Sequence, residues 1–228
     1  MKCIVQFFMK PDGFDQPVYN NLKHDNELFA YSVKSVQLYA KQCGADYQMV
    51  DTPRINHVHP TFERYDLWLN DAWWQKYTHI LYLDTDVIVW PDAPNVFAMY
   101  PDVDSFKPCD DRLAHSRPPE YHERLAQGTV LEKYDGQTLQ QQRFNAGVFM
   151  LTQQSASVMK PYVDVDSFQD DDNLHMIDIM LQSRVAVEYM DARFNKKMGI
   201  TSWFGHAYGQ DKHQPNNKVI SQCRKIFR

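Results

Sequence analysis

Positive charge is in the minority in this sequence. Its 228 residues carry 24 lysines and arginines against 29 aspartates and glutamates, which gives a formal net charge of -5. Binding to nucleic acid without sequence preference depends on a basic field over the surface, and this chain has none. The composition therefore argues against a nucleic-acid partner, and any phosphate binding has to be local.

Long apolar runs and paired cysteines are also missing. No stretch of about 18 apolar residues occurs, so no transmembrane segment is expected. The opening MKCIVQFFMKPDGFD has no small-residue cleavage site, which argues against a signal peptide. The four cysteines form no Cys-x-x-Cys motif and are typical of reduced thiols. These absences predict a soluble, cytoplasmic protein.

The chain shows no internal repeat, and its length suits one domain over 1–228. Apolar runs and helical patterns alternate along its first part, which indicates βαβ units, a mostly parallel sheet and an α/β fold. In such sheets ligands bind at the carboxyl ends of the strands. The predicted strands are 2–8, 46–51, 79–90, 143–151 and 186–191; the predicted helices are 26–44, 61–77, capped by Thr61, and 172–183; loops and short helices are predicted over 110–142, and a loop over 199–218.

Two carboxylates interrupt the apolar run HILYLDTDVIVWPD. Asp84 and Asp86 are one residue apart, and on an extended strand such side chains point the same way. Buried carboxylates are costly unless something positive meets them. A hard divalent cation that bridges to a diphosphate is the natural partner of such a pair.

Four interpretations fit this aspartate pair. A haloacid-dehalogenase-like phosphatase would use Asp84 as a phosphorylated nucleophile, although that motif normally ends the first strand. A nucleotide-sugar glycosyltransferase of the GT-A fold would use the pair to hold manganese or magnesium. A nucleotidyltransferase would need a better glycine-rich loop than MKPDGFD. A non-catalytic module that binds a sugar nucleotide or a glycan is the fourth.

The segment HAYGQDK favours the glycosyltransferase. It resembles the closing motif of the retaining glycosyltransferases related to glycogenin and to bacterial lipopolysaccharide galactosyltransferases. The resemblance implies that His206 is the third metal ligand. It also implies that Gly209 lets the backbone approach the diphosphate and that Lys212 contacts a phosphate. An imidazole suits a carboxylate-rich metal site, and a lysine would neutralise charge on a leaving diphosphate.

Other segments resemble the same family. RFNAGVFML is similar to its Phe-Asn-(Ala/Ser)-Gly-Val strand and implies that Asn145 lies near the donor sugar. Asp172-Asn173 aligns with an Asp-Gln helix start, supported by a Trp-Asn-like ARFNKK downstream, with Asp171 or His175 as alternatives for the sugar contact. The remaining donor contacts that the resemblance implies are Arg64, Thr85 and Asp111, with Gln6 and Phe7 near the base.

The resemblance implies a Rossmann-like GT-A domain with a nucleotide-binding half over 1–92 and a donor-sugar and acceptor half over 93–228. The expected activity is metal-dependent transfer of a sugar from a nucleoside diphosphate sugar, a UDP-sugar above all, with retention. The acceptor would be a hydroxyl of a glycan, glycoprotein or glycolipid. The segment Arg112–Gln142 is expected to help form the acceptor side.

Overall fold

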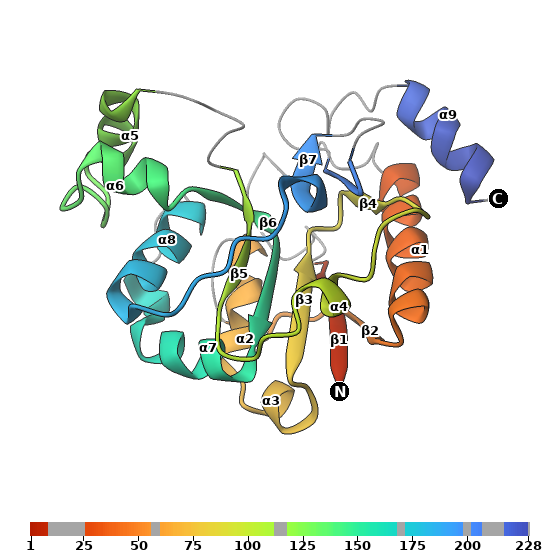
Figure 1. Ribbon diagram of the computed structural model, residues 1–228, viewed down its shortest axis with the longest axis horizontal. Coiled ribbons are helices and arrows are strands. Elements are labelled where there is room, and N and C mark those ends of the chain that lie inside the picture. The colour runs from red at the N-terminus through yellow and green to blue at the C-terminus, as the bar shows by residue number, and fades with distance from the viewer. Residues whose placement is uncertain are drawn as a thin grey trace.

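A computed structural model of the protein describes residues 1–8, 26–55, 60–111, 118–167, 172–197, 202–206 and 217–227. Two sheets and a set of helices make up this part of the chain (Figure 1). The strands are β1 (Lys2–Phe7), β2 (Asp46–Val50), β3 (His79–Leu83), β4 (Val87–Val89), β5 (Lys107–Asp110), β6 (Phe144–Thr152), β7 (Lys196–Lys197) and β8 (Phe204–His206). The α-helices are α1 (Asn26–Cys43), α2 (Asp66–Leu69), α3 (Ala72–Lys76), α4 (Val96–Met99), α5 (Pro119–Ala126), α6 (Gly136–Gln141), α7 (Gln153–Met159), α8 (Asp172–Ser183) and α9 (Asn217–Ile226). Short 3-10 helices are Pro60–Tyr65, Lys160–Tyr162, Val165–Ser167 and Ala192–Asn195.

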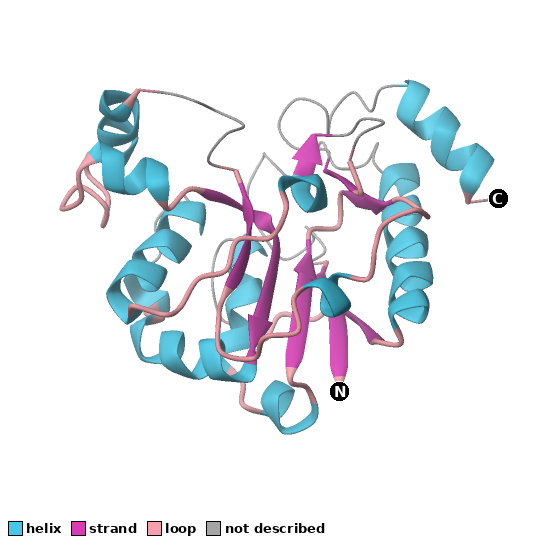
Figure 2. Cartoon of the chain, viewed as in Figure 1, coloured by secondary structure: helices cyan, strands magenta, loops and turns pink. Residues whose placement is uncertain are grey.

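The main sheet has the strand order β2-β1-β3-β6-β5. Strand β1 pairs in parallel with β2 and β3, as βαβ units require, while β6 runs antiparallel to both β3 and β5. The sheet is therefore mixed, and the predicted α/β class with helices on both faces is confirmed. A second sheet, β4-β8-β7, lies beyond the upper ends of β1 and β3 (Figure 2).

Side chains alternate between two cores across the main sheet. On one face, residues such as Val5 and Tyr82 pack with α2, α3, α7 and α8. On the other, residues such as Ile4 and Leu81 pack with α1, α4 and the small sheet. A third cluster joins α9 to α1 and β4. Continuous burial of β1 and β3 explains why these strands read as unbroken apolar runs.

The prediction of one strand over 79–90 is wrong. The chain leaves the main sheet after β3, makes a β-turn from Asp84 to Val87, and enters the second sheet as β4. The Val87 amide closes the turn on the Asp84 carbonyl at 3.1 Å. The two aspartates therefore converge because of a turn, and not because they lie on one extended strand.

The prediction of one helix over 61–77, capped by Thr61, is also wrong. Thr61 lies inside a 3-10 helix, and two short α-helices follow with a break at Asn70, whose backbone is extended (φ -102°, ψ 101°). The break lets the second helix fold back on the first. The indole of Trp73 then donates to Asp66, and that of Trp74 to the Leu67 carbonyl, each at 2.8 Å. These buried indole contacts outweigh the cost of ending the helix.

The predicted strand over 186–191 is present only as two isolated parallel bridges, Phe106 to Val187 and Cys109 to Met190. Its partner β5 has a register shift between Pro108 and Asp110. Proline has no amide hydrogen, so a regular ladder cannot run through that position. No helix in the described part of the chain combines the length and the apolarity that a membrane span requires.

Candidate metal centre

Three predicted metal ligands meet where the two sheets join. Asp84 and Asp86 lie on the turn between β3 and β4, and His206 ends β8. Antiparallel pairing of β4 with β8 sets Val87 opposite His206 and so carries the imidazole to the turn. One candidate ligand atom from each of the three residues lies within 4.8 Å of the others. No other group of three or more His, Cys, Asp or Glu with this spacing occurs in the described residues.

The imidazole of His206 faces both carboxylates through the same nitrogen. Its Nε2 is 3.1 Å from Asp86 Oδ1 and 3.5 Å from Asp84 Oδ2. Burial of the ring disfavours its charged form, but the charge of Asp86 and the nearness of both carboxylates outweigh it. They raise the pKa of His206 to about 9. Without a metal, a proton on His206 offsets part of the negative charge.

These residues fit a divalent cation. Cis ligands of a six-coordinate ion are roughly 3 Å apart and trans ligands roughly 4.2 Å, as follows from bonds of about 2.1 Å. The observed separations of 3.1 and 3.5 Å match cis positions. The two carboxylates suit magnesium and manganese, and the imidazole, a ligand of transition metals, favours manganese of the two.

Gly147 on β6 makes room for this cluster. A Cβ at this position would lie 2.2 Å from His206 Cε1 and 2.8 Å from Asp84 Oδ2. The Gly147 carbonyl also accepts a hydrogen bond from the Asp84 amide at 2.8 Å. Gly147 therefore holds the backbone of the turn against β6 while leaving space for the side chains of Asp84 and His206.

Asn195 joins His206 to the predicted sugar-binding residue Asn145. The Asn195 Oδ1 is 2.8 Å from His206 Nδ1. Its Nδ2 donates to the carbonyl oxygen of Asn145 at 3.1 Å and to that residue's Oδ1 at 3.2 Å. Sequence reasoning assigned no site role to Asn195 or to Gly147; the only signal was their place in the motifs ARFNKK and FNAGV.

Arg64 and Tyr82 fix the carboxylate of Asp84. The buried Arg64 guanidinium donates to the Ala146 carbonyl at 2.8 Å and contacts Asp84 Oδ1 at 3.4 Å. The Tyr82 hydroxyl donates to the same carboxylate oxygen at 2.5 Å. Arg64, predicted to contact the donor, is thus held beside Asp84 by protein groups.

The two residues predicted near the base lie at the end of β1. Gln6 is fully buried; its Nε2 donates to Ser32 and to the Asp84 carbonyl, and its Oε1 accepts from Tyr47. Phe7 belongs to the core and is 8% exposed. Gln6 therefore holds the backbone of the turn at Asp84, the residue before the half-buried Thr85.

The remaining predicted residues are more dispersed. Asp111 is half-buried, with its Oδ2 3.6 Å from Arg143 Nε. Asp172 begins α8, but its side chain, like Gly209 and Lys212, lies outside the described residues. The next residue, Asn173, accepts a hydrogen bond from the Ala146 amide at 2.7 Å, which ties the start of α8 to β6.

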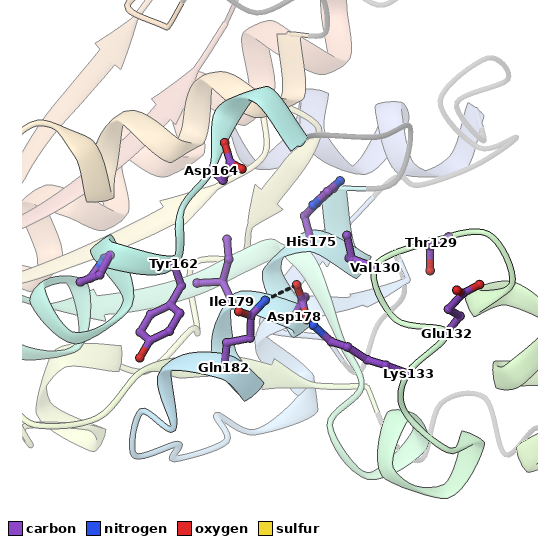
Figure 3. Close-up of a pocket in the computed structure, with 11 residues that line it drawn as sticks. Thr129, Val130, Glu132, Lys133, Tyr162, Asp164, His175, Asp178, Ile179 and Gln182 are labelled. Carbon is purple, nitrogen blue, oxygen red and sulfur yellow. Dashed lines mark hydrogen bonds and ion pairs between the residues drawn. The ribbon is translucent and has the colours of Figure 1, made fainter.

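A cavity of about 530 Å³ opens beside α8 (Figure 3). Its walls come from α8, from the chain around Tyr162 and from the loop Thr129–Lys133 between α5 and α6. Asp178 belongs to its wall; Asp178 Oδ1 is 3.0 Å from Lys133 Nζ, and Asp178 Oδ2 accepts from Gln182 Nε2 at 2.5 Å. His175 lines the cavity two residues after Asn173, so one helix serves both the cavity and β6.

Comparisons with known proteins show what this fold is. No family model and no curated protein sequence matches the chain. A glycosyltransferase involved in the glycosylation of the major capsid of PBCV-1 superposes with a TM-score of 0.59, at 12% identity, over 99% of each chain. Galactosyltransferase LgtC, solved with donor and acceptor sugar analogs, gives 0.52 at 15% identity over 98% of this chain and 95% of its own. The glycosyltransferase GlyE of Streptococcus pneumoniae TIGR4 gives 0.52 at 13% identity over 99% of this chain and 59% of its own.

These structural likenesses extend over nearly the whole chain. The sequence identities of 12% and 15% are too low for a sequence comparison alone to establish them. Because each match covers 98–99% of this chain, the likeness is one of the overall fold and not of a local motif. The chain has the GT-A fold of the nucleotide-sugar glycosyltransferases, as its motifs predicted.

Proposed function

We propose that this protein is a metal-dependent glycosyltransferase that moves a sugar from a nucleoside diphosphate sugar to an acceptor hydroxyl. The observation that carries the proposal is the Asp84, Asp86 and His206 cluster at the carboxyl end of β3. Ligands of α/β sheets bind at that edge. The likeness of the fold to solved glycosyltransferases supports the same reaction class.

Each residue has a chemical task in this proposal. Asp84, Asp86 and His206 hold a manganese or magnesium ion, which when bound supplies positive charge to the donor diphosphate. Lys212 neutralises the charge that develops as the glycosidic bond breaks, and Gly209 allows the backbone to approach. The donor sugar is oriented by Asn145, Asp111 and Asp172; Arg64, Thr85, Gln6 and Phe7 complete the nucleotide side. A UDP donor and retention of configuration follow from the motif resemblance, and no nucleophile is assigned.

The first test is a calorimetric titration of UDP into the protein, with manganese or with a chelator. We expect binding that needs manganese and that His206→Ala weakens. Binding that ignores both the metal and His206 would contradict the mechanism. No binding in either condition would favour the phosphatase alternative, which predicts a phosphoenzyme that Asp84→Asn abolishes and no role for His206.

The acceptor side is proposed to include Arg112–Gln142. Within it, Thr129–Lys133 lines the cavity beside α8 together with hydroxyl, amide and carboxylate groups of the kind that bind sugars. Deleting the whole segment would remove Leu131 and Leu139 from the core, so point variants are the cleaner test.

Glu132→Ala and Tyr162→Ala are expected to spare metal-dependent donor hydrolysis and to lower transfer to the acceptor. Both side chains line the cavity and neither touches the metal cluster. Glu120→Ala, an exposed residue of α5 outside the cavity, is the control. Equal loss of hydrolysis and transfer in the cavity variants would contradict this placement of the acceptor.

A further inference from the structure

A chain of hydrogen bonds leads from the backbone of β6 to the metal ligand His206. It starts at a donor of known identity, the Gly147 amide, which donates to the Asn145 side chain at 2.9 Å. The acceptor in that bond must be the amide oxygen of Asn145, because only an oxygen can accept there. The orientation of the Asn145 side chain is therefore fixed by the main chain.

The next hydrogen bonds fix the orientation of the Asn195 side-chain amide. Its side chain lies against two acceptors, the Asn145 carbonyl at 3.1 Å and Asn145 Oδ1 at 3.2 Å. The group facing them has to be the NH₂ of Asn195, which leaves its oxygen on the opposite side. That oxygen is 2.8 Å from His206 Nδ1.

The last hydrogen bond fixes which nitrogen of the His206 imidazole carries the hydrogen. An amide oxygen only accepts, so His206 Nδ1 must carry the hydrogen. In the neutral ring the lone pair then belongs to Nε2, the nitrogen that faces Asp86 at 3.1 Å and Asp84 at 3.5 Å. A metal bound between the carboxylates would meet the nitrogen that can ligate it.

We infer that Asn195 is a positioning residue that selects the metal-binding nitrogen of His206 and couples the metal centre to Asn145. The inference rests on the proposed function, because it gives Asn195 a task at the proposed metal and sugar sites. Outer partners of this kind fix the ring orientation of metal-binding histidines, and their loss typically lowers metal affinity about 10–100-fold.

The position of Asn195 suits this role. It ends the 3-10 helix Ala192–Asn195 directly before β7, which pairs with β8 so that Lys197 lies opposite His206. Asn195 is 8% exposed, and Phe194 beside it is fully buried. The amide is therefore held by the core and by the small sheet, and has little freedom to turn.

Two substitutions separate the contact of Asn195 with His206 from its two contacts with Asn145. Asn195→Leu has a similar size and removes all three. Asn195→Asp keeps an acceptor for His206 Nδ1 but loses the donor to Asn145. Asn95→Asp is the matched control, since Asn95 caps α4 through acceptor bonds alone and lies outside the metal cluster.

The measurements are calorimetric titrations with manganese alone, and with UDP and UDP-galactose in the presence of manganese. We expect Asn195→Leu to lower manganese affinity about 10–100-fold. Asn195→Asp should bind manganese like wild type. The ratio of its affinity for UDP-galactose to its affinity for UDP should be about tenfold lower than in wild type, which is the effect of losing one hydrogen bond. Unchanged manganese affinity in Asn195→Leu, or equal losses in both variants, would overturn the inference.

A second readout separates this inference from the proposed function. In the ¹⁵N NMR spectrum, wild type should show a slowly exchanging Nδ1–H signal, assigned by its loss in His206→Ala. It should persist in Asn195→Asp and vanish in Asn195→Leu. A wild-type protein that binds no manganese would overturn the proposed function, whereas absence of this signal in wild type would overturn the inference itself.

Discussion

A Cβ atom at Gly147 would collide with the side chains of His206 and Asp84. We expect Gly147→Ala to lower manganese affinity at least tenfold, because its Cβ would displace His206 or Asp84 and so cost the site one ligand. The measurement is calorimetric titration with manganese, beside a thermal melt.

The control for this substitution is Gly128→Ala. Gly128 has a φ of +73° and open space around its Cβ position. Its substitution should cost about 1–2 kcal/mol of stability through backbone strain and leave manganese binding unchanged. If Gly147→Ala lowers only stability, as the control does, the close contact with the ligands has no role in metal binding.

The protonation of His206 predicts a pH dependence. In the metal-free protein its pKa of about 9 lies above the ordinary value of 6.5, so its proton stabilises the fold. This stabilisation is complete below about pH 6.5 and is lost as the pH rises through about 9. Melting temperatures measured in a chelator should fall more over this range for wild type than for His206→Gln.

Manganese should remove that difference, because the ion takes the place of the proton on Nε2. With saturating manganese, the melting temperature of wild type should no longer fall between pH 6.5 and 9 more steeply than that of His206→Gln. Identical pH profiles for the two proteins in the chelator would show that His206 does not hold the proton.

The three residues that cluster could be predicted from the sequence, whereas the residues that support them could not. Asp84, Asp86 and His206 are chemically conspicuous, because carboxylates in an apolar run and a histidine in a glycine-rich segment need a reason. Gly147 and Asn195 act through contacts with residues distant in the sequence. Glycine and asparagine occur in many strands and turns, so the sequence pattern does not indicate those contacts.

At the scale of elements, the order of strands and helices could be predicted, but two connections could not. The β-turn at Asp84 looks like part of a strand because apolar residues flank it on both sides, and those residues belong to two different sheets. The break at Asn70 depends on where the Trp73 and Trp74 indoles find acceptors. Both are decided by tertiary contacts that override local preference.

Helix α9 should influence nucleotide binding. It packs on α1 and β4, and Phe227, directly after the helix, stacks near Trp90 at 6.4 Å between ring centroids. In the sequence, α9 follows the segment that contains Gly209 and Lys212, to which the proposed function gives the diphosphate contacts. Phe227→Ala should cost about 3 kcal/mol of stability and weaken the packing of α9 on α1 and β4. Calorimetry should show weaker UDP binding but unchanged binding of manganese alone.

The control is Lys225→Ala; Lys225 belongs to α9 and its side chain is exposed. It should change neither stability nor UDP binding. If Phe227→Ala weakens manganese and UDP binding in equal measure, the helix supports the whole domain and not the segment next to it.

At the scale of the whole molecule, metal binding should stabilise the fold. A ligand that binds only the folded state at about 100 times its dissociation constant adds about 2.7 kcal/mol. For a chain of 228 residues this corresponds to a rise of about 5–10 °C in the melting temperature. Scanning calorimetry with manganese should show this rise for wild type.

The double variant Asp84→Asn, His206→Gln tests whether the rise comes from this cluster. Its melting temperature should not respond to manganese, because one ligand of the three remains. An equal rise in the double variant would place the metal elsewhere in the molecule.

Asp84 and Asp86 lie between β3 and β4, whereas His206 lies on β8, far later in the sequence, so the three residues can come together only after β8 has been synthesised. A chain emerging from the ribosome exposes Asp84 and Asp86 with the parallel half of the main sheet, long before Phe204–His206 can pair with β4. Until that pairing forms, the turn would offer the proposed ion only the two carboxylates. A nascent chain that stops before β8 would therefore hold much of its core yet capture no metal tightly, and tight capture would mark the moment at which synthesis has passed β8 and the second sheet has closed.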